Sequence, residues 1–410
     1  MGKAKENRGL ILLGTVIAQL GLGTIYSWSL FNQPLVNKFG WNLNRVALTF
    51  SIASLALSIS TLFTGKLQEK FGIKKVVCFC GILFGVGLIL TSFANKLALL
   101  YIFAGIMVGI ADGIAYMMTL SNCIKWFPEK KGLISGISVG AYGVGSLLFK
   151  YIDQAFLKAF GVSGAFEYWG IIGMVLIFIG GLLLKQAPLN PVAEQAKTNG
   201  QKVEDNNFTV KEMLKTKEAY LLFIVFFSAC MSGLYLIGIV KDIGVSLAHL
   251  DVQVAANAVA MVAIFNTVGR IILGGLSDKV GNLKVLAFDF IVTAVAVFVL
   301  LFVNLNFGIF FACVAAIAFC FGGNITIFPS LVGDFFGLKN HNKNYGVIYQ
   351  GFGLGAFSGS IIANIVGGFK PTFMVIGVLC IISLIIVLTV KAPHHKGDTK
   401  NIKGKVALNM

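Results

Sequence analysis

GGLSDKVGNLK, residues Gly274 to Lys284, is a short polar stretch that follows a long apolar segment. The first half of the chain contains a similar stretch, GKLQEKFGIKK, residues Gly65 to Lys75, which also follows an apolar segment. The copies align over Gly72 and Gly281, which are 209 positions apart, and an acidic residue stands three positions before each glycine. The chain therefore contains an internal repeat.

A second pair of similar stretches has nearly the same spacing. Gly143-Val144-Gly145 in the first half corresponds to Gly353-Leu354-Gly355 in the second half, 210 positions later. Two unrelated matches at one offset are not expected by chance, so we interpret the chain as two similar halves. Parallel repeats of this kind are typical of membrane transporters.

The composition indicates a membrane protein. The chain has 410 residues, of which 57% are hydrophobic and 12% are charged, whereas soluble domains carry about 25% charged residues. Apolar segments of about 20 residues, the length of a membrane-spanning helix, recur along nearly the whole chain. A β-barrel would instead show short segments of alternating polarity. The fold class predicted is therefore an all-α membrane protein.

We predict twelve transmembrane helices, six in each half. They cover residues 9–31, 44–64, 76–94, 97–124, 132–154, 165–184, 219–240, 253–275, 285–305, 307–331, 345–366 and 371–390. The basic start of the chain leads directly into the first span without a small-residue cleavage site, so we expect no cleaved signal peptide.

The distribution of basic residues predicts the orientation in the membrane. With these spans, 25 of the 33 Lys and Arg residues lie on the side of the N-terminus and 7 on the other side, while Arg270 lies within a span. Cytoplasmic loops carry the excess of Lys and Arg. We therefore expect both termini in the cytoplasm, and the net charge of +16 reflects this topology rather than a nucleic-acid partner.

Four domains follow from these boundaries: an N-terminal half (1–184), a cytoplasmic linker (185–218), a C-terminal half (219–392) and a cytoplasmic tail (393–410). Within the linker, Thr209 and Glu212 have the spacing of a capping box that opens a short helix.

The sequence offers little for an enzyme, a metal or a cofactor. The seven cysteines lie in apolar spans and the four histidines in loops or the tail, so we expect neither a metal site nor a disulfide. A phosphate-binding loop with the Gly-Lys-Ser/Thr ending is also absent from the sequence, which argues against ATP-driven transport. We therefore expect a secondary transporter that needs no cofactor.

The Gly-x-Leu-x-Asp-x-x-Gly pattern of the two repeated stretches resembles the motif of the major facilitator superfamily, where it forms the loop between the second and third helices of each half. The first copy departs from the pattern, with Glu69 in place of the aspartate and Gln68 before it. The resemblance covers about residues 8–392 and implies the fold of two six-helix halves. It also implies a cytoplasmic gate formed by Glu69, Lys70, Asp278 and Lys279, although these residues could act as topology anchors alone.

Five further stretches resemble the oxalate/formate antiporter family within that superfamily. They are GTIYSWSLFNQP (23–34), KWFPEKKGLISG (125–136), FNTVGRIILGGLSDKVG (265–281), FPSLVGDFFG (328–337) and NYGVIY (344–349). The chain is most similar to the enterobacterial inner-membrane members linked to pyruvate, a monocarboxylate. This resemblance implies a bacterial inner-membrane location.

The resemblance also implies where the substrate binds. In the family's oxalate exchanger, an arginine in helix eight and a lysine in helix eleven hold a dicarboxylate. Arg270 matches the arginine, but Phe352 stands where the lysine would be. The family's cavity aromatics correspond to Tyr26 and Trp28, which are retained, and to two positions that have become less polar, Phe321 and Ile325.

Tyr349 and Gln350 are further candidates for polar residues that line the pocket from helix eleven.

Arg270 is also unusual on physical grounds alone. An ionisable group within a span costs a few kcal/mol and marks a functional candidate. A guanidinium stays charged, and its fork fits one carboxylate with two hydrogen bonds. Its alternative role is a gate contact to Asp278, Asp334 or the carbonyl groups at helix ends.

Asp112, in the middle of the fourth span, is the second anomaly. No basic residue is near it in the sequence, and an unpaired carboxylate in a low dielectric takes up a proton. We interpret Asp112 as a proton-coupling residue. The alternatives are a fixed ion pair with Arg270 or Lys150, or a hydrogen-bonded neutral acid.

These observations predict a secondary active transporter of a small organic anion, with a monocarboxylate such as pyruvate as the expected substrate, that works by alternating access. The transport is expected to be coupled to a proton or to a counter-anion. The alternatives are an oxalate/formate-type exchanger, a multidrug efflux pump, and a non-transporting sensor built on the same fold.

Overall fold

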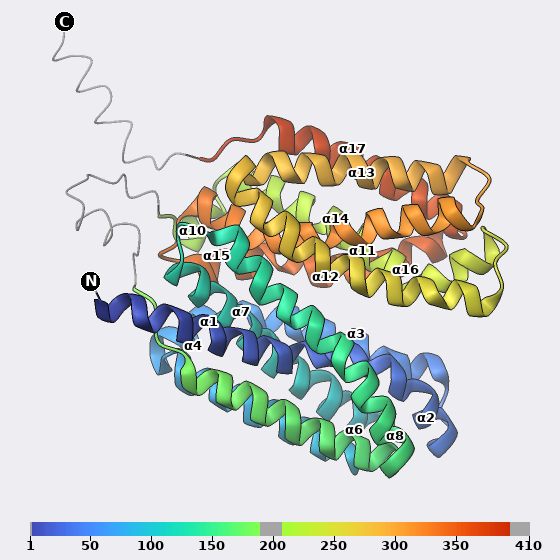
Figure 1. Ribbon diagram of the computed structural model, residues 1–410, viewed down its shortest axis with the longest axis horizontal. Coiled ribbons are helices and arrows are strands. Elements are labelled where there is room, and N and C mark those ends of the chain that lie inside the picture. The colour runs from blue at the N-terminus through green and yellow to red at the C-terminus, as the bar shows by residue number, and fades with distance from the viewer. Residues whose placement is uncertain (1, 189–206, 394–410) are drawn as a thin grey trace, which may run out of the picture.

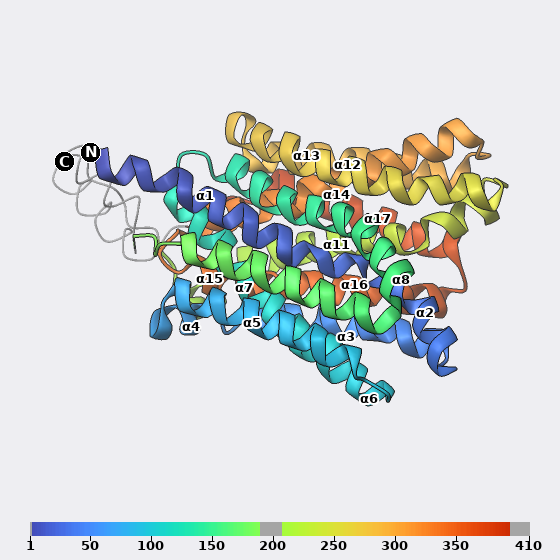
Figure 2. The ribbon, with the colours of Figure 1, turned by 60° about the horizontal axis from the view of Figure 1, so that its bottom comes forward.

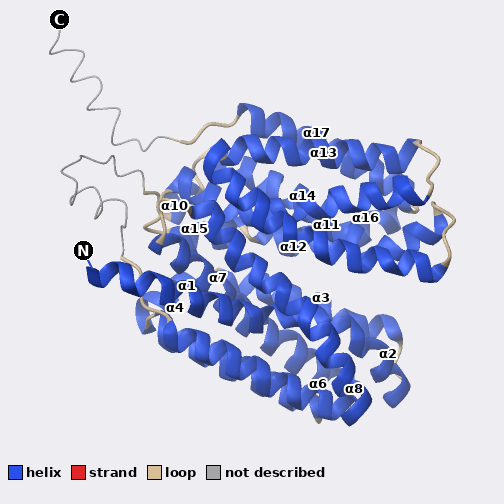
Figure 3. Ribbon diagram, viewed as in Figure 1, coloured by secondary structure: helices blue, strands red, loops and turns tan. Residues whose placement is uncertain are grey.

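The computed structural model describes residues 2–188 and 207–393, and within these ranges every regular element is a helix (Figure 3). The first half, residues 2–188, contains α1 (Gly2–Gly23), η1 (Thr24–Trp28), α2 (Ser29–Phe39), α3 (Leu43–Thr61), α4 (Thr64–Phe71), α5 (Ile73–Ser92), α6 (Leu97–Leu100), η2 (Tyr101–Met107), α7 (Val108–Trp126) and α8 (Lys131–Leu183). The second half, residues 207–393, contains α10 (Val210–Met213), α11 (Lys217–Ser246), α12 (Val252–Val280), α13 (Asn282–Phe302), α14 (Phe307–Phe336), α15 (His341–Ile348), α16 (Gln350–Val366) and α17 (Phe369–Thr389).

The helices account for the twelve predicted spans. Ten helical segments of the described residues are long and apolar enough to cross a membrane, and the pair α3 and α4, bent by 57°, makes an eleventh. α8 contains 53 residues, which at about 1.5 Å per residue is more than twice the thickness of a hydrocarbon core. Gly161, with φ 66° and ψ −174°, breaks this helix into two spans, which brings the total to twelve.

The two halves lie one above the other, with their long helices running roughly along the same axis (Figures 1 and 2). The start of α1 and the end of α17 lie at one end of the molecule, together with α4, α10 and α15. We call this end the terminal face. Having both chain ends on one face is what an even number of spans requires.

The repeated glycines explain how each half is packed. A Cβ atom at Gly145 of α8 would clash with the backbone of Leu20 in α1, the first helix of the first half. A Cβ atom at Gly355 of α16 would lie 2.8 Å from the Cβ atom of Cys230 in α11, the first spanning helix of the second half. Small residues let membrane helices approach closely, so the repeat preserves one helix crossing in each half.

The motif stretches differ from the prediction that they form loops. Gly65 to Phe71 belong to α4, and Gly274 to Val280 form the end of α12. Only Gly72 and Gly281 leave the helical conformation, with φ values of 77° and 104°, and the next helix starts at the following residue in each case. Glycine adopts positive φ without a steric penalty, so a single residue suffices as the turn and the predicted longer loop was wrong.

The linker and the tail are described only in part. The capping box is confirmed, because the Thr209 side chain accepts from the Glu212 amide and the Glu212 side chain accepts from the Thr209 amide at the start of α10. Residues 189–206 of the predicted linker and 394–410 of the predicted tail lie outside the described residues. The proposed domain boundaries therefore stay a prediction.

Candidate substrate pocket

A small pocket lies where the two halves meet. Its lining from the first half consists of Tyr26, Tyr116, Val139 and Tyr142, and its lining from the second half consists of Arg270, Ile325, Tyr349 and Phe352. The structure thus brings five of the predicted site residues together: Arg270, Tyr26, Ile325, Tyr349 and Phe352.

Arg270 is the cation of this pocket. It is only 6% exposed, and its Nη1 atom donates a hydrogen bond of 2.7 Å to the carbonyl oxygen of Val139 in α8. Its Nε atom has no hydrogen-bond partner among the described residues. α8 can approach α12 here because Gly143 stands opposite: a Cβ atom at that position would lie 3.2 Å from Arg270 Nη1. The guanidinium therefore keeps donors available for a ligand in the pocket.

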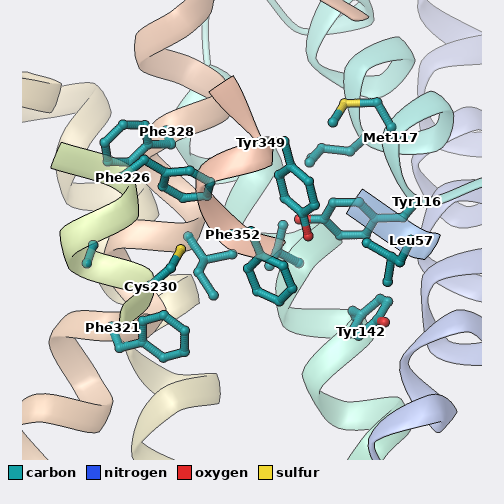
Figure 4. Packing of buried hydrophobic residues seen from close by; sticks show 14 of the residues in the cluster. Leu57, Tyr116, Met117, Tyr142, Phe226, Cys230, Phe321, Phe328, Tyr349 and Phe352 are labelled. Atoms are coloured by element: carbon teal, nitrogen blue, oxygen red, sulfur yellow. The ribbon is translucent and has the colours of Figure 1, made fainter. Parts of the chain in front are cut away.

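Aromatic rings form the rest of the wall and cross the boundary between the halves. Tyr142 packs with Tyr26 and with Tyr116, each at a centroid distance of 5.5 Å. Tyr116 packs with Tyr349 of the second half at 5.5 Å, and Tyr349 stacks on Phe352 at 5.1 Å (Figure 4). The pocket thus offers hydroxyl groups near the first half and an apolar ring in the second.

Asp112 lies behind this wall, in α7. It is fully buried, and its Oδ2 atom accepts a hydrogen bond of 3.0 Å from the hydroxyl group of Tyr142. Its Oδ1 atom has no hydrogen-bond partner among the described residues, and none of the ion pairs in the described part of the chain joins Asp112 to Arg270 or Lys150. Arg270 and Asp112 are therefore each hydrogen-bonded to α8, Arg270 at the carbonyl group of Val139 and Asp112 at the hydroxyl group of Tyr142, three residues further along.

Two of the predicted site residues lie away from the pocket. Trp28 packs in the aromatic core of the first half, with ring centroids 5.8 Å from Phe166 and 6.3 Å from Phe31. Phe321 of α14 packs directly against Gly233 of α11, on the far side of Cys230 from the tyrosines (Figure 4). Both residues are more than 95% buried, so they act as core residues in this arrangement.

Gln350 joins the halves beside the pocket instead of lining it. Its Nε2 atom donates to the carbonyl oxygen of Ser58 in α3 at 2.8 Å and to that of Gly346 in α15 at 2.8 Å. The neighbouring residue, Tyr349, does line the pocket. A change of contact between α3 and α16 would therefore move a pocket residue as well.

Sequence reasoning missed Tyr116, Val139 and Tyr142. Val139 contributes its backbone carbonyl group, which no side-chain pattern reveals. Tyr142 immediately precedes the Gly143-Val144-Gly145 repeat, and this proximity to a close helix crossing is the one signal that could have indicated it.

The predicted gate residues Glu69 and Asp278 connect the two halves at the terminal face. Glu69 of α4 forms an ion pair of 2.6 Å with Lys343 of α15. Asp278, near the end of α12, accepts hydrogen bonds of 2.7 Å from the amide groups of both Gly132 and Leu133 at the start of α8. A carboxylate is stabilised at a helix N-terminus, where amide groups lack partners within the helix.

The two predicted gate lysines differ from their acidic neighbours. The ammonium group of Lys70 lies 5.1 Å from the ring centroid of Phe71, within its own helix. Lys279 takes no part in the hydrogen bonds and ion pairs that join the halves within the described ranges.

Further contacts close the terminal face. Lys131 of α8 forms an ion pair with Asp334 of α14. His341 of α15 is completely buried, and its ring nitrogens lie 2.8 Å from Ser121 Oγ and 2.7 Å from the carbonyl oxygen of Pro329. The Lys131–Asp334 and His341–Ser121 contacts join elements of different halves, whereas the His341–Pro329 contact lies within the second half. The crossing contacts hold the two halves together at the terminal face.

Comparison with known proteins identifies the family. The chain matches the model described as Major Facilitator Superfamily over residues 11–303 and 221–408. It is 48% identical over 352 residues to the uncharacterized MFS-type transporter YhjX of Escherichia coli (strain K12), with 86% of each chain covered. It is 30% identical over 385 residues to the oxalate:formate antiporter of Oxalobacter formigenes, with 91% of this chain and 88% of that protein covered.

The fold agrees with solved structures of this superfamily. The proton:xylose symporter XylE, solved with 6-bromo-6-deoxy-D-glucose, superimposes with a TM-score of 0.76 over 96% of this chain and 97% of that chain, at 13% identity. At this identity the likeness concerns the fold alone. Together with the sequence matches it means that the chain is a multi-pass membrane transporter of the major facilitator superfamily, and that within the superfamily it belongs to the family of the oxalate:formate antiporter.

Proposed function

We propose that the chain is a secondary active transporter of small organic anions that binds a monocarboxylate, with pyruvate as the best candidate, in the pocket around Arg270. The observation that carries the proposal is the buried guanidinium, which has one hydrogen bond to a backbone carbonyl and no acidic partner among the described residues. A buried cation without a counter-charge is costly. An anionic substrate supplies that charge and accepts hydrogen bonds from the fork of the guanidinium.

The number of charges in the pocket favours one carboxylate over two. Each carboxylate transferred into a low dielectric needs its own counter-charge, and Arg270 is the only basic residue in the lining of the described pocket. Phe352 and Ile325 form an apolar wall of the same pocket. Pyruvate can place its carboxylate at Arg270 and its methyl group against this apolar wall. Formate has no methyl group and oxalate has a second carboxylate, so we rank pyruvate above formate and well above oxalate.

The lining of the pocket argues against efflux of cationic drugs. Its charged residue is the cation Arg270, and the lining of the described pocket contains no acidic residue. Anion exchange is the second candidate, because the relative from Oxalobacter formigenes is named an oxalate:formate antiporter. Exchange and symport both fit alternating access at a site between two halves.

Asp112 supports a proton-coupled mode of transport. Its carboxyl group is buried, accepts a hydrogen bond from Tyr142 of the pocket lining, and has no cationic partner within the described ranges. We propose that Asp112 binds and releases the coupling proton. Because Tyr142 is hydrogen-bonded to Asp112 and lines the pocket, we propose that its position responds to the charge of Asp112.

We further propose that the terminal face lies in the cytoplasm and that the membrane is the bacterial inner membrane. The excess of Lys and Arg on that side supports the orientation. The similarity to an Escherichia coli transporter supports the location.

Substitution of Arg270 tests the proposal in reconstituted vesicles. We expect Arg270→Gln to abolish uptake of labelled pyruvate, because the variant loses the only cation of the pocket. Arg270→Lys should also lose most of the uptake, since a point charge cannot form two parallel hydrogen bonds to one carboxylate. Lys74→Gln, at an exposed residue, is the control for the loss of one positive charge. Near-normal uptake by Arg270→Gln in correctly inserted protein would assign Arg270 to a structural role.

A further inference from the structure

The described part of the chain forms a second pocket at the terminal face. It lies among the gate residues rather than at the tyrosine cluster. Gln68, Glu69 and Lys125 line it from the first half, and Lys339, Asn342 and Lys343 line it from the second half. Because both halves contribute, the pocket is complete only while they meet at this face.

The charges around this gate pocket are unbalanced. Glu69 is the one acidic residue in its lining, and it is already paired with Lys343 at 2.6 Å. Lys125 is 8% exposed, and its ammonium group donates a hydrogen bond of 3.0 Å to the backbone carbonyl of Lys339. Neither Lys125 nor Lys339 is in an ion pair within the described ranges. The lining therefore contains three lysines and one glutamate, a net charge of +2, and Glu69 is the acid near both Lys125 and Lys343.

A neutral donor lines the same pocket. Gln68 is 6% exposed, and its Oε1 atom accepts a hydrogen bond from the side-chain amide of Asn342. In this arrangement the buried Gln68 Nε2 donor and the buried Asn342 Oδ1 acceptor both have no partner among the described residues. Buried donors are normally satisfied by protein, water or ligand. Two cations and one free amide donor are the groups that bind a small oxyanion.

We infer that the gate pocket binds a small anion, a carboxylate or a phosphate, and that the bound anion stabilises the arrangement in which the terminal face is sealed. A ligand that binds to only one conformation shifts the population toward that conformation. The bound anion would therefore lower the population of the conformation that is open toward the terminal face. The inference does not depend on which substrate the central pocket carries.

The thermal unfolding of purified protein in detergent tests this inference, with sodium phosphate replacing sodium chloride at constant ionic strength. We expect phosphate to raise the unfolding midpoint in a saturable way. Lys339→Gln should raise the half-saturating phosphate concentration by at least about tenfold, because a charge-assisted hydrogen bond is lost. Lys339→Arg, which keeps the charge at an exposed position, should bind phosphate nearly as well as the unaltered protein.

Two further variants separate this site from other sources of the effect. Lys74→Gln removes one exposed charge outside the pocket and should leave the phosphate-dependent rise of the unfolding midpoint unchanged. If Lys74→Gln weakened phosphate binding as much as Lys339→Gln, phosphate would be binding to the protein surface in general, and the inference would be overturned. Arg270→Gln should also keep the phosphate response. Its loss in Arg270→Gln would place the anion in the central pocket instead and overturn the inference too.

The source of the anion is tested in the same Arg270→Gln background. A saturable response to pyruvate that Lys339→Gln abolishes would identify carboxylates as ligands of the gate pocket. A response to phosphate alone would identify phosphate. The absence of a response to both anions would contradict the site.

Discussion

At the scale of single residues, the account rests on two ionisable groups in the membrane interior. Arg270 and Asp112 are 6% and 0% exposed, and the sequence indicates both because charge within a span is rare. The sequence could not indicate Tyr116, and its one signal for Tyr142 is the adjacent Gly143-Val144-Gly145 repeat. In a membrane helix both the lipid-facing and the interior surface are apolar, so the pattern of the sequence does not show which way a tyrosine points.

The same limit explains Trp28, Phe321 and Gln350. Their residue types suit a substrate pocket, but the rotation of their helices places them in the core or at the contact between α3 and α16. The position of a residue along a span can be predicted from hydropathy, whereas its direction depends on packing between segments far apart in the sequence.

Asp112→Asn tests the proton-coupling role at this scale. The asparagine oxygen can still accept the hydrogen bond from Tyr142, but the side chain no longer binds a proton. We expect an inward proton gradient to accelerate pyruvate uptake in the unaltered protein but not in the variant, whereas exchange of internal for external pyruvate is retained.

Asp153→Asn is the matched control for this experiment. Asp153 is also buried, but it is bonded to Ser27 and does not line the pocket. Uptake that still responds to the gradient in Asp112→Asn would assign Asp112 to a structural role.

At the scale of helices, the sequence predicts the number of spans and most of their positions. It separated the two spans of α8 correctly, with one ending at 154 and the next beginning at 165 on either side of Gly161, but it failed at α4, which is polar yet helical. In both cases one glycine with positive φ, Gly161 or Gly72, ends a helical segment. Hydropathy does not reveal α4, because a polar helix that is shorter than a membrane span has no hydropathy signature of its own. It also does not reveal a turn of one residue.

Gly23→Ala tests the importance of close helix packing. A Cβ atom at Gly23 would clash with the backbone of Tyr142, the residue that joins the pocket to Asp112. Overpacking of this kind typically costs about 1–3 kcal/mol, so we expect a lower unfolding temperature together with reduced pyruvate uptake.

Gly9→Ala, in the same helix, serves as the comparison because no atom lies within 4 Å of its added Cβ. Equal unfolding temperatures and equal pyruvate uptake in the two alanine variants would show that close packing at Gly23 is not important.

At the scale of the whole molecule, the two halves are joined at the terminal face by side chains on α4, α7, α8, α12, α14 and α15. The central pocket lies between the halves. Alternating access requires these contacts to break while others form on the opposite side. The repeat at an offset of 209 residues predicted two halves, but which of their surfaces meet is a property of the assembled fold.

Asp278→Ala tests this gate. The substitution leaves two amide groups at the start of α8 without their acceptor, and loss of such a cap typically costs about 0.5–2 kcal/mol. We expect the sealed conformation to become less populated, and pyruvate uptake to fall several-fold. Lys279→Ala changes the adjacent residue, which takes no part in the contacts between halves described above, and should retain uptake. If both variants lowered pyruvate uptake equally, the motif residues would act only in setting the topology and not as a gate.

The central claim is that one buried cation selects a monocarboxylate, and the most direct measurement is uptake of labelled pyruvate and labelled oxalate by the purified protein in reconstituted vesicles. Arg270 offers one charge and Phe352 an apolar wall, so the account predicts strong uptake of pyruvate and weak uptake of oxalate. Phe352→Lys should weaken pyruvate uptake and favour oxalate. Equal transport of both anions by the unaltered protein would contradict the account, because it would require a second cation that the described pocket does not contain.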